Sequence, residues 1–291
     1  MGTYSATRRR RAQMVMGPLA VLLLSIELGC GADAQQPVTK NGPERSCDVV
    51  ITIVYDNHPL DKRLKTAWGF ACVIEGLSET ILFDTGGEGK LLLANMAKLG
   101  FQPEQIDSIV LSHIHGDHTG GLGALLEANS KVKVFVPKAF PADFKQAVRQ
   151  RGADFVETEG PCNICDGAWT TGVLKRGTEE QGLYLKTPRG LVVITGCAHP
   201  GIVPMAKAAS GHGRMPVYAV LGGFHMAGAS ASKVDAVIQD LREIGVQQVA
   251  PCHCSGDKTR RLMKEAFGEG YLPSGVGARL VFPGQHQSED R

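Results

Sequence analysis

Four side chains that can bind metal ions lie within six consecutive residues of this chain: His113, His115, Asp117 and His118. In an extended backbone, side chains two residues apart point to the same side, so His113 and His115 can bind one metal ion together. The chain then turns at Gly116, after which the aspartate and the last histidine can face a second ion. These ligands suit two divalent metal ions, Zn2+ above all, with iron or manganese as alternatives.

The residues around this segment predict short strands that alternate with helices. Runs of β-branched and apolar residues predict strands at 49–54, 69–75, 79–83, 109–111, 132–136, 183–186, 191–195, 217–221, 246–250 and 279–282. Apolar residues spaced three and four apart, with capping residues beside them, predict helices at 88–99, 122–128, 140–149, 230–244 and 259–267. Residues 157–170 show neither pattern and are expected to form a loop.

Residues with metal-binding chemistry follow predicted strands in both halves of this pattern, roughly 48–170 and 171–283. In the second half these residues are Cys197, His199, His225 and His253. Strands and helices that alternate in two halves favour an α/β protein. We expect an αββα sandwich, in which two mixed β-sheets pack face to face and helices cover the outer faces. The chemical residues would then gather at one edge of the sandwich.

Several of these residues have a second interpretation. Cys197 is either a metal ligand or a small buried apolar residue. His199 is either a further imidazole ligand or an ordinary loop residue. His225 either contacts substrate or metal, or makes a structural hydrogen bond. Asp84 ends a predicted strand beside Gly86, where an aspartate can also be present only to form the turn.

The segment from His113 to His118 resembles the H-x-H-x-D-H signature of the metallo-β-lactamase superfamily. Further motifs follow the order of that family: Asp84 before the histidines, then Gly196-Cys-Ala-His199, then His253 after the last short strand. The Gly-Cys-x-His motif is similar to one branch, which contains the dihydropterin–ribofuranosylaminobenzene phosphate synthases. The resemblance covers residues 48–283 and implies the αββα fold.

The resemblance also implies roles for individual residues. Asp84 would not bind metal but would orient the histidine segment. Cys197 occupies the position where the superfamily usually has an aspartate that bridges both metal ions, and a thiolate can replace it as a softer ligand. His253 would be the last metal ligand. Cys252 and Cys254 flank His253 and are expected to point away from it, as packing or pairing thiols.

The expected chemistry is hydrolysis of an ester, lactone, amide or phosphoester by a metal-bound hydroxide. Asp117 would take up a proton from the nucleophile, and His199 or His225 would protonate the leaving group or hold a substrate oxyanion. The branch resemblance implies an alternative, a transferase like the pterin-related synthases. A second alternative is an iron or redox protein that does not hydrolyse its ligand, because Cys197 is a soft ligand.

The N-terminal residues have the pattern of an export signal. Arginines occupy positions 8–11, an apolar core follows at 14–26, and small residues precede Gln35. The core is too short to span a membrane comfortably. We therefore expect a signal peptide at 1–34, a linker at 35–47, a polar tail at 284–291 and a periplasmic location. Cys30 leaves a lipoprotein or membrane-tethered form open.

The net charge of +2 is accounted for by residues 1–34, which hold four arginines against Glu27 and Asp33. The rest of the chain is close to neutral, so the composition gives no reason to expect a nucleic-acid partner. A small-molecule substrate is expected, no integral membrane span remains after signal removal, and the sequence leaves the oligomeric state open.

The chain has eight cysteines, of which Cys30 would leave with the signal. The remaining seven are an odd number, so at least one cannot pair within the chain. Cys162 and Cys165 form a Cys-x-x-Cys motif in the expected loop. In an exported protein we expect a local disulfide there, with a metal or redox pair and free thiols as the alternatives.

Overall fold

The computed structural model describes residues 48–284, all of which belong to one compact unit. The predicted signal peptide (1–34), the linker (35–47) and residues 285–291 of the predicted tail lie outside the described residues. Between residues 48 and 284, none of the helices is both long enough and apolar enough to cross a membrane.

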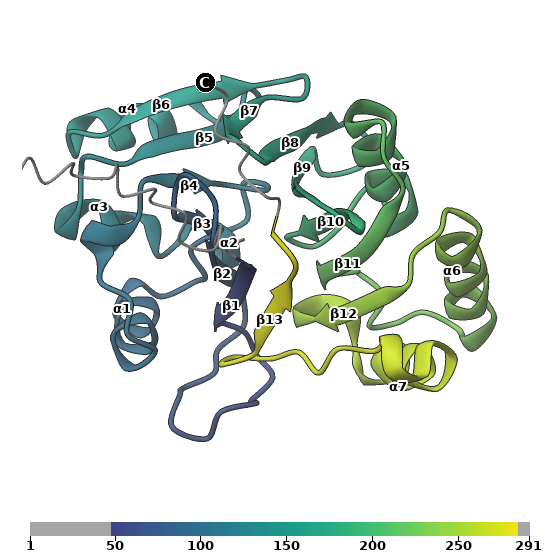
Figure 1. Cartoon of the computed structure of the whole chain (residues 1–291). Coiled ribbons are helices and arrows are strands. Elements are labelled where there is room, and N and C mark those ends of the chain that lie inside the picture. Colours follow the sequence, from purple (N-terminus) through teal and green to yellow (C-terminus); the bar gives the residue numbers. More distant parts are fainter. Residues whose placement is uncertain (1–47, 285–291) are drawn as a thin grey trace, which may run out of the picture. The chain divides into compact units, whose positions relative to one another are not determined.

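The first sheet contains seven strands and is covered by the helices of the first half of the chain (Figure 1). Its strands, in spatial order, are β13 (Arg279–Phe282), β1 (Val49–Tyr55), β2 (Ala71–Glu75), β3 (Ile81–Phe83), β4 (Ser108–Val110), β5 (Lys133–Pro137) and β6 (Asp154–Thr158). The pairs from β13 to β3 are antiparallel, whereas β3, β4, β5 and β6 are parallel. The helices of this half are α1 (Gly89–Lys98), α2 (Gly116–Thr119), α3 (Leu122–Ala128) and α4 (Ala142–Gln150), with a 3-10 turn at Pro103–Gln105.

The second sheet contains six strands. In spatial order they are β12 (Gln248–Cys252), β11 (Val217–Gly223), β10 (Gly190–Thr195), β9 (Glu180–Thr187), β8 (Ala168–Leu174) and β7 (Asn163–Cys165). Strands β10, β11 and β12 are parallel, and the other pairs are antiparallel. The helices are α5 (Ile202–Gly213), α6 (Ala231–Glu243) and α7 (Asp257–Phe267), with 3-10 turns at His253–Ser255 and Gly268–Gly270.

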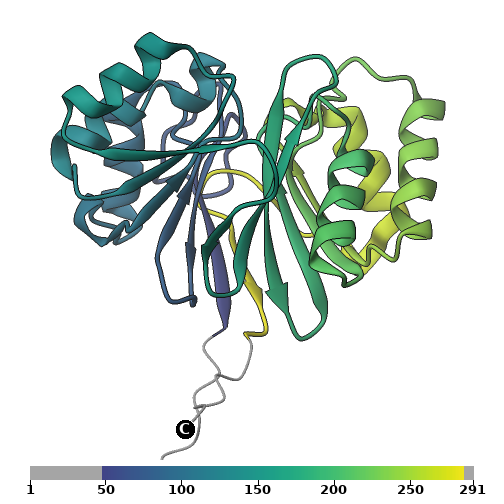
Figure 2. The ribbon, with the colours of Figure 1, turned by 90° about the horizontal axis from the view of Figure 1, so that it is seen from above.

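Three apolar clusters hold these layers together. The central cluster joins side chains of both sheets, including Ile51 and Phe83 from the first and Leu183 and Ile194 from the second. One outer cluster packs α1, α3 and α4 on the first sheet, and the other packs α5, α6 and α7 on the second. Figure 2 shows the two sheets face to face with helices outside both. The predicted αββα sandwich is confirmed.

Two features of the predicted arrangement are wrong. The expected loop at 157–170 contains the end of β6, all of β7 and the start of β8, because these strands are short and separated by turns such as Gly160-Pro161. The division near residue 170 also does not match the sheets. Strands β7 and β8 already belong to the second sheet, and β13 returns to pair with β1 in the first.

Helix α5 follows the site motif at 196–201 and was not predicted. Its sequence contains Pro204 and two glycines, Gly211 and Gly213, which weaken a helical pattern. Pro204 lies in the first turn, where a missing backbone N–H costs nothing. The helix forms because its apolar side chains, including Met205 and Ala209, are buried against the second sheet.

The expected disulfide between Cys162 and Cys165 is not formed, since both are free thiols in the structure. Cys165 ends β7 and Cys162 immediately precedes it. Residues three apart in a strand are separated by about 10 Å, whereas a disulfide needs Cα atoms within about 7 Å. The extended backbone of β7 is thus consistent with two free thiols at these positions.

Candidate metal centre

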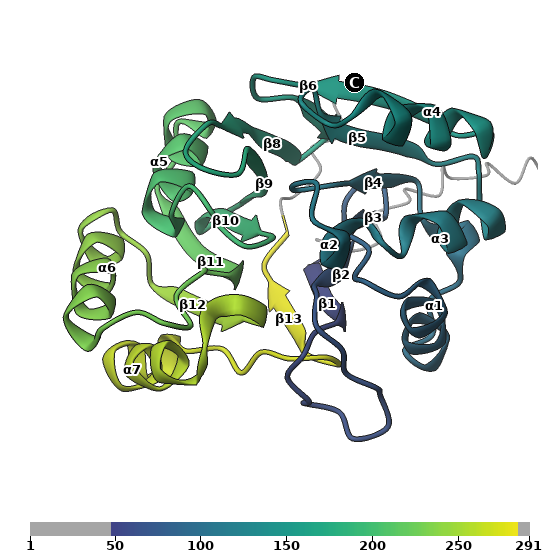
Figure 3. The ribbon, with the colours of Figure 1, turned by 180° about the vertical axis from the view of Figure 1, so that it is seen from behind.

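The residues with metal-binding chemistry follow the carboxyl ends of strands in both sheets. Asp84 follows β3 and His113 lies three residues beyond the end of β4, while Cys197, His225 and His253 follow β10, β11 and β12. Carboxyl ends of parallel strands lie at one edge of a sheet, where ligand sites are commonly built. The face-to-face packing brings the two edges together, and in Figure 3 helix α2, which contains Asp117 and His118, lies between the two sheets.

One group of possible ligands consists of His113, His115 and His199. One ligand atom of each lies within 4.8 Å of those of the other two. Nε2 of His113 is 3.1 Å from Nδ1 of His115, and the His199 ring centre lies 4.8 Å and 4.9 Å from theirs. His113 is buried and His115 is exposed. The group therefore lies where the buried site opens to solvent.

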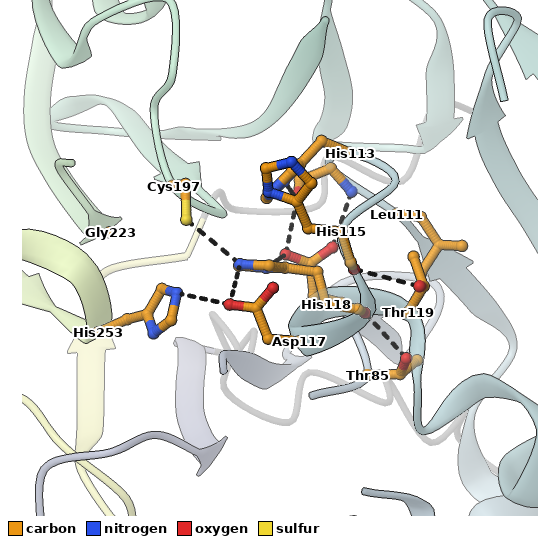
Figure 4. Close-up of polar contacts among 12 residues, drawn as sticks. Thr85, Leu111, His113, His115, Asp117, His118, Thr119, Cys197, Gly223 and His253 are labelled. Atoms are coloured by element: carbon orange, nitrogen blue, oxygen red, sulfur yellow. Dashed lines mark hydrogen bonds and ion pairs between the residues drawn. The ribbon is translucent and has the colours of Figure 1, made fainter. Parts of the chain in front are cut away.

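A second group consists of Asp117, His118 and His253. Oδ2 of Asp117 lies 3.6 Å from Nε2 of His118 and 3.3 Å from Nε2 of His253 (Figure 4). The Cys197 Sγ atom lies 3.3 Å from Nε2 of His118. In a tetrahedral zinc site with bonds of about 2.1 Å, neighbouring ligand atoms are about 3.4 Å apart. The distances from Asp117 to His118 and to His253, and from His118 to Cys197, are close to that value.

Asp84 fixes the histidine segment through three hydrogen bonds. Its Oδ1 accepts from the Ser112 backbone N–H at 2.7 Å, and its Oδ2 accepts from the Ser112 hydroxyl at 2.7 Å. The same Oδ2 is 2.7 Å from Nδ1 of His118. Burial lowers the pKa of His118, but the charge and hydrogen bond of Asp84 outweigh it and raise that pKa. With Nδ1 directed at Asp84, Nε2 of His118 faces the site, which is the arrangement expected of a metal-binding histidine.

Gly196 makes this arrangement possible at the end of β10. A Cβ atom at this position would lie 2.1 Å from Oγ of Ser112 and 2.8 Å from Oδ2 of Asp84. Only a residue without a side chain allows the Cys197 backbone to approach the histidine segment so closely.

His253 is positioned by residues that the sequence did not indicate. Its Nδ1 lies 2.9 Å from Oδ1 of Asn57, and its backbone N–H donates to the buried Asp56 carboxylate at 3.1 Å. Both residues follow β1, almost 200 positions earlier in the sequence. The buried Nε2 atoms of His253 and His199 have no hydrogen-bond partner within residues 48–284. Buried nitrogens that make no hydrogen bond are costly, and a metal ion would satisfy both, in addition to the 3.3 Å contact of His253 Nε2 with the Asp117 carboxylate.

Glu180 is a further buried residue that the sequence did not indicate. Its Oε1 accepts hydrogen bonds from the backbone N–H groups of Cys197 and Ala198, both at 2.9 Å. Its Oε2 accepts from the His199 N–H at 2.8 Å. Burial raises the pKa of Glu180. This single carboxylate holds the whole loop that presents the thiol and the imidazole. An acid shortly before the apolar residues 183–185 was the one available signal.

Cys254 differs from the expectation that both cysteines beside His253 are packing or pairing thiols. Cys252 packs in the central apolar cluster. Cys254 instead brings its Sγ atom within 4.8 Å of the ligand atoms of Cys197 and His225. The reason lies in the backbone, because His253 has a φ of 48° and begins a 3-10 turn. The alternation of an extended strand, on which the expectation depended, ends at this residue.

Backbone strain is concentrated at the site. Within residues 48–284, five residues other than glycine have positive φ angles. Four of these five residues carry or adjoin the possible metal ligands. They are Asp84, Ala198, His225 and His253, with φ between 48° and 56°. Such conformations cost about 1–3 kcal/mol each and persist where surrounding contacts enforce them. The packing of the two sheet edges therefore fixes the positions of these side chains.

Three of the candidate ligands, Asp117, His199 and His113, have protonation states that suit metal binding at neutral pH. Burial raises the pKa of Asp117, but contact with the His253 imidazole and the charge of His118 outweigh it and lower that pKa to about 2. Burial and the charges of His225 and His115 lower the pKa of His199 to about 4. Burial also lowers the pKa of His113. The carboxylate is thus ionised and these two imidazoles are neutral, as metal ligands must be.

Comparisons with known proteins identify the family of this chain. A family model described as the metallo-beta-lactamase superfamily matches residues 69–223. The 7,8-dihydropterin-6-methyl-4-(beta-D-ribofuranosyl)-aminobenzene-5'-phosphate synthase of Methanocaldococcus jannaschii is 32% identical over 252 residues, covering 71% of this chain and 86% of that protein. The chain therefore belongs to the metallo-β-lactamase superfamily. It resembles the branch that contains this synthase, as the sequence motifs predicted.

Solved structures extend the comparison. Tm1679, described as a metal-dependent hydrolase of the beta-lactamase superfamily, is 26% identical with a TM-score of 0.68 and covers 81% of this chain and 99% of its own. YhfI from Bacillus subtilis, a metallo-beta-lactamase fold protein, is 15% identical with a TM-score of 0.61, over 80% of this chain and 99% of its own. The second likeness supports the fold alone. The prediction of an enzyme with this fold is confirmed.

Proposed function

We propose that this protein is a metal-dependent hydrolase that holds two divalent ions, zinc by preference. The observation that carries the proposal is the pair of three-residue groups, His113–His115–His199 and Asp117–His118–His253, with the Cys197 thiol beside them. Each group offers ligand atoms at the spacing of one ion, and the buried Nε2 atoms of His199 and His253 make no hydrogen bond within residues 48–284.

When bound, divalent ions at such a site would lower the pKa of a water molecule and stabilise the negative charge that develops during hydrolysis. The protein's own residues determine how these ligands are presented. Asp84 and Glu180 hold the two ligand loops. A pKa of about 2 for Asp117 favours a role as a ligand over one as a proton acceptor, because an acceptor works best with a pKa near the operating pH.

The substrate would enter a pocket of about 370 Å³ beside His199. Arg176 and Lys233 line this pocket with positive charge, and Phe224 and Ile202 contribute apolar walls. Neither cation makes an ion pair within residues 48–284, although Asp240 also lines the pocket. Two unpaired cations near a metal centre favour an anionic substrate. Among the expected substrates, a phosphoester fits this charge best.

Elemental analysis of the full chain, purified without chelator or added metal, tests the metal centre. We expect about two zinc ions per chain, because the two ligand groups each suit one ion. The variants His115→Ala and Asp117→Ala should lose most of the metal and of the phosphoesterase activity while the far-ultraviolet circular dichroism stays unchanged. His212→Ala is the matched control, because His212 lies near the C-terminal end of α5 and contacts Tyr184 on β9.

Full metal content in either site variant would show that the ligand assignment is wrong. Iron in place of zinc would favour the redox alternative, which optical spectroscopy would then test. Turnover on panels of phosphoesters, lactones and amides would then rank the hydrolytic substrates.

A transferase like the pterin-related synthases is the second candidate. Besides the likeness to the Methanocaldococcus jannaschii protein, one observation favours it. Trp68 is 58% exposed although it is large and apolar, and its ring centre lies 4.7 Å from that of His253. An exposed aromatic ring beside the centre can stack on a planar heterocycle. Binding of a pterin that quenches the Trp68 fluorescence, and is lost in Trp68→Ala, would support this candidate over a simple hydrolase.

A further inference from the structure

A third cluster of possible ligands lies beside the two groups assigned above. It consists of Cys197, His225 and Cys254, whose Sγ and imidazole nitrogen atoms all lie within 4.8 Å of one another. The three residues come from three different loops, those that follow β10, β11 and β12. Only Cys197 is shared with the centre described above. The sequence did not indicate this cluster, because Cys254 was expected to point away.

The backbone holds His225 and Cys254 opposite each other. The Phe224 N–H donates to Oγ of Ser255 at 3.1 Å, and the Met226 N–H donates to the Cys254 carbonyl at 3.2 Å. The residues on both sides of His225 are therefore tied to the turn that carries Cys254. His225 has a φ of 52°, which turns its side chain out of the strand direction. Such a strained residue needs the fixed surroundings that these bonds provide.

A glycine makes room for the second sulfur. A Cβ atom on Gly223 would lie 2.7 Å from Sγ of Cys254 and 2.3 Å from the Gly196 carbonyl oxygen. Cys254 is buried, whereas His225 is exposed and lines the substrate pocket. The cluster thus has two buried sulfur ligands and one imidazole at its entrance. An ion can reach it from solvent.

We propose that Cys197, Cys254 and His225 form a separate binding site for a thiophilic metal ion, next to the hydrolytic centre. Two thiolates and one imidazole select soft or borderline ions such as Zn2+, Cd2+ or Cu+ over Mg2+ or Ca2+. Cys197 lies between both sites, since its sulfur is also 3.3 Å from Nε2 of His118, and a thiolate has enough lone pairs to bind two ions. His225 then acts as a ligand rather than as the proton donor expected from the sequence.

Cadmium binding to the metal-free full-length protein tests the site, with elemental analysis for the number of ions and near-ultraviolet absorption for cadmium–thiolate bonds. The wild type should bind one Cd2+ ion in addition to the two ions proposed for the hydrolytic centre. Cys254→Ser should lose that ion, and the thiolate absorption of the protein should fall by about half, because only Cys197, which also lies beside His118, then remains to bind Cd2+ through sulfur at the hydrolytic centre. His225→Asn, a change at an exposed residue, should lose the same ion while keeping the fold.

Cys252→Ser is the matched control, since Cys252 is a neighbouring buried thiol that packs in the central cluster, and it should bind Cd2+ like the wild type. If Cys254→Ser and His225→Asn both kept the wild-type number of ions and the full absorption, the proposal would be overturned. The hydrolytic centre is judged separately. His115→Ala should lose an ion without losing thiolate absorption, and retention of all ions in that variant would refute the centre but not the thiol site.

Discussion

Replacing Glu180 by glutamine tests how strongly the ligand loop depends on one buried carboxylate. The glutamate accepts three backbone hydrogen bonds, from Cys197, Ala198 and His199, at 2.8–2.9 Å. Glutamine has one oxygen acceptor, and its amide group would place a donor opposite the N–H of at least one of these residues. Leaving a buried N–H without an acceptor costs about 1–3 kcal/mol. Removing a buried charge offsets part of this cost.

We therefore expect Glu180→Gln to lower the free energy of unfolding of the metal-free protein by about 2 kcal/mol. Because the affected loop carries Cys197 and His199, we also expect zinc affinity to fall about 10–100-fold, as for other residues that orient metal ligands. Urea unfolding measures the first effect, and zinc competition against a chromophoric chelator measures the second. Wild-type values in both assays would refute the reasoning.

Glu159→Gln is the matched control. Glu159 is an exposed glutamate that pairs with Lys138 and Lys175 on the surface, and its replacement should change neither stability nor zinc affinity measurably. If Glu180→Gln lowered stability but kept wild-type zinc affinity, the carboxylate would support the fold without positioning the ligands.

Two further predictions concern Asp84 and His199. Asp84→Asn would place an amide donor opposite Nδ1 of His118, so the histidine should shift its proton to Nε2 and bind zinc at least about 10-fold more weakly. Chelator competition measures the zinc affinity, and nitrogen NMR identifies the imidazole tautomer. Unchanged zinc affinity would contradict this prediction. The pKa of His199 is lowered from 6.5 to about 4 in the folded protein, first by burial. The unfolded chain therefore binds the proton more tightly, and the metal-free protein should lose stability as pH falls from 6.5 towards 4. The His199→Gln variant should show a weaker pH dependence. Identical urea midpoints for the wild type and this variant across this pH range would contradict the lowered pKa of His199.

The sequence by itself determined the histidine segment and the order of the motifs. Ligands at 113, 115, 117 and 118 are close in space because they are close in the chain, so local geometry is sufficient to predict that they meet. The alternation of strands and helices determined the αββα class for a similar reason, since each apolar face must be buried against another layer. Family membership followed from these local patterns.

Only the tertiary structure decided which residues from distant strands complete the site. Asn57 and Asp56 reach His253 from the other sheet, and Glu180 holds a loop that begins 17 residues later. The orientation of Cys254 depended on a positive φ at His253, which no side-chain pattern signals. Strand β13 likewise leaves the second half to pair with β1. Contacts of this kind depend on how two sheets pack, and short-range periodicity carries no information about that packing.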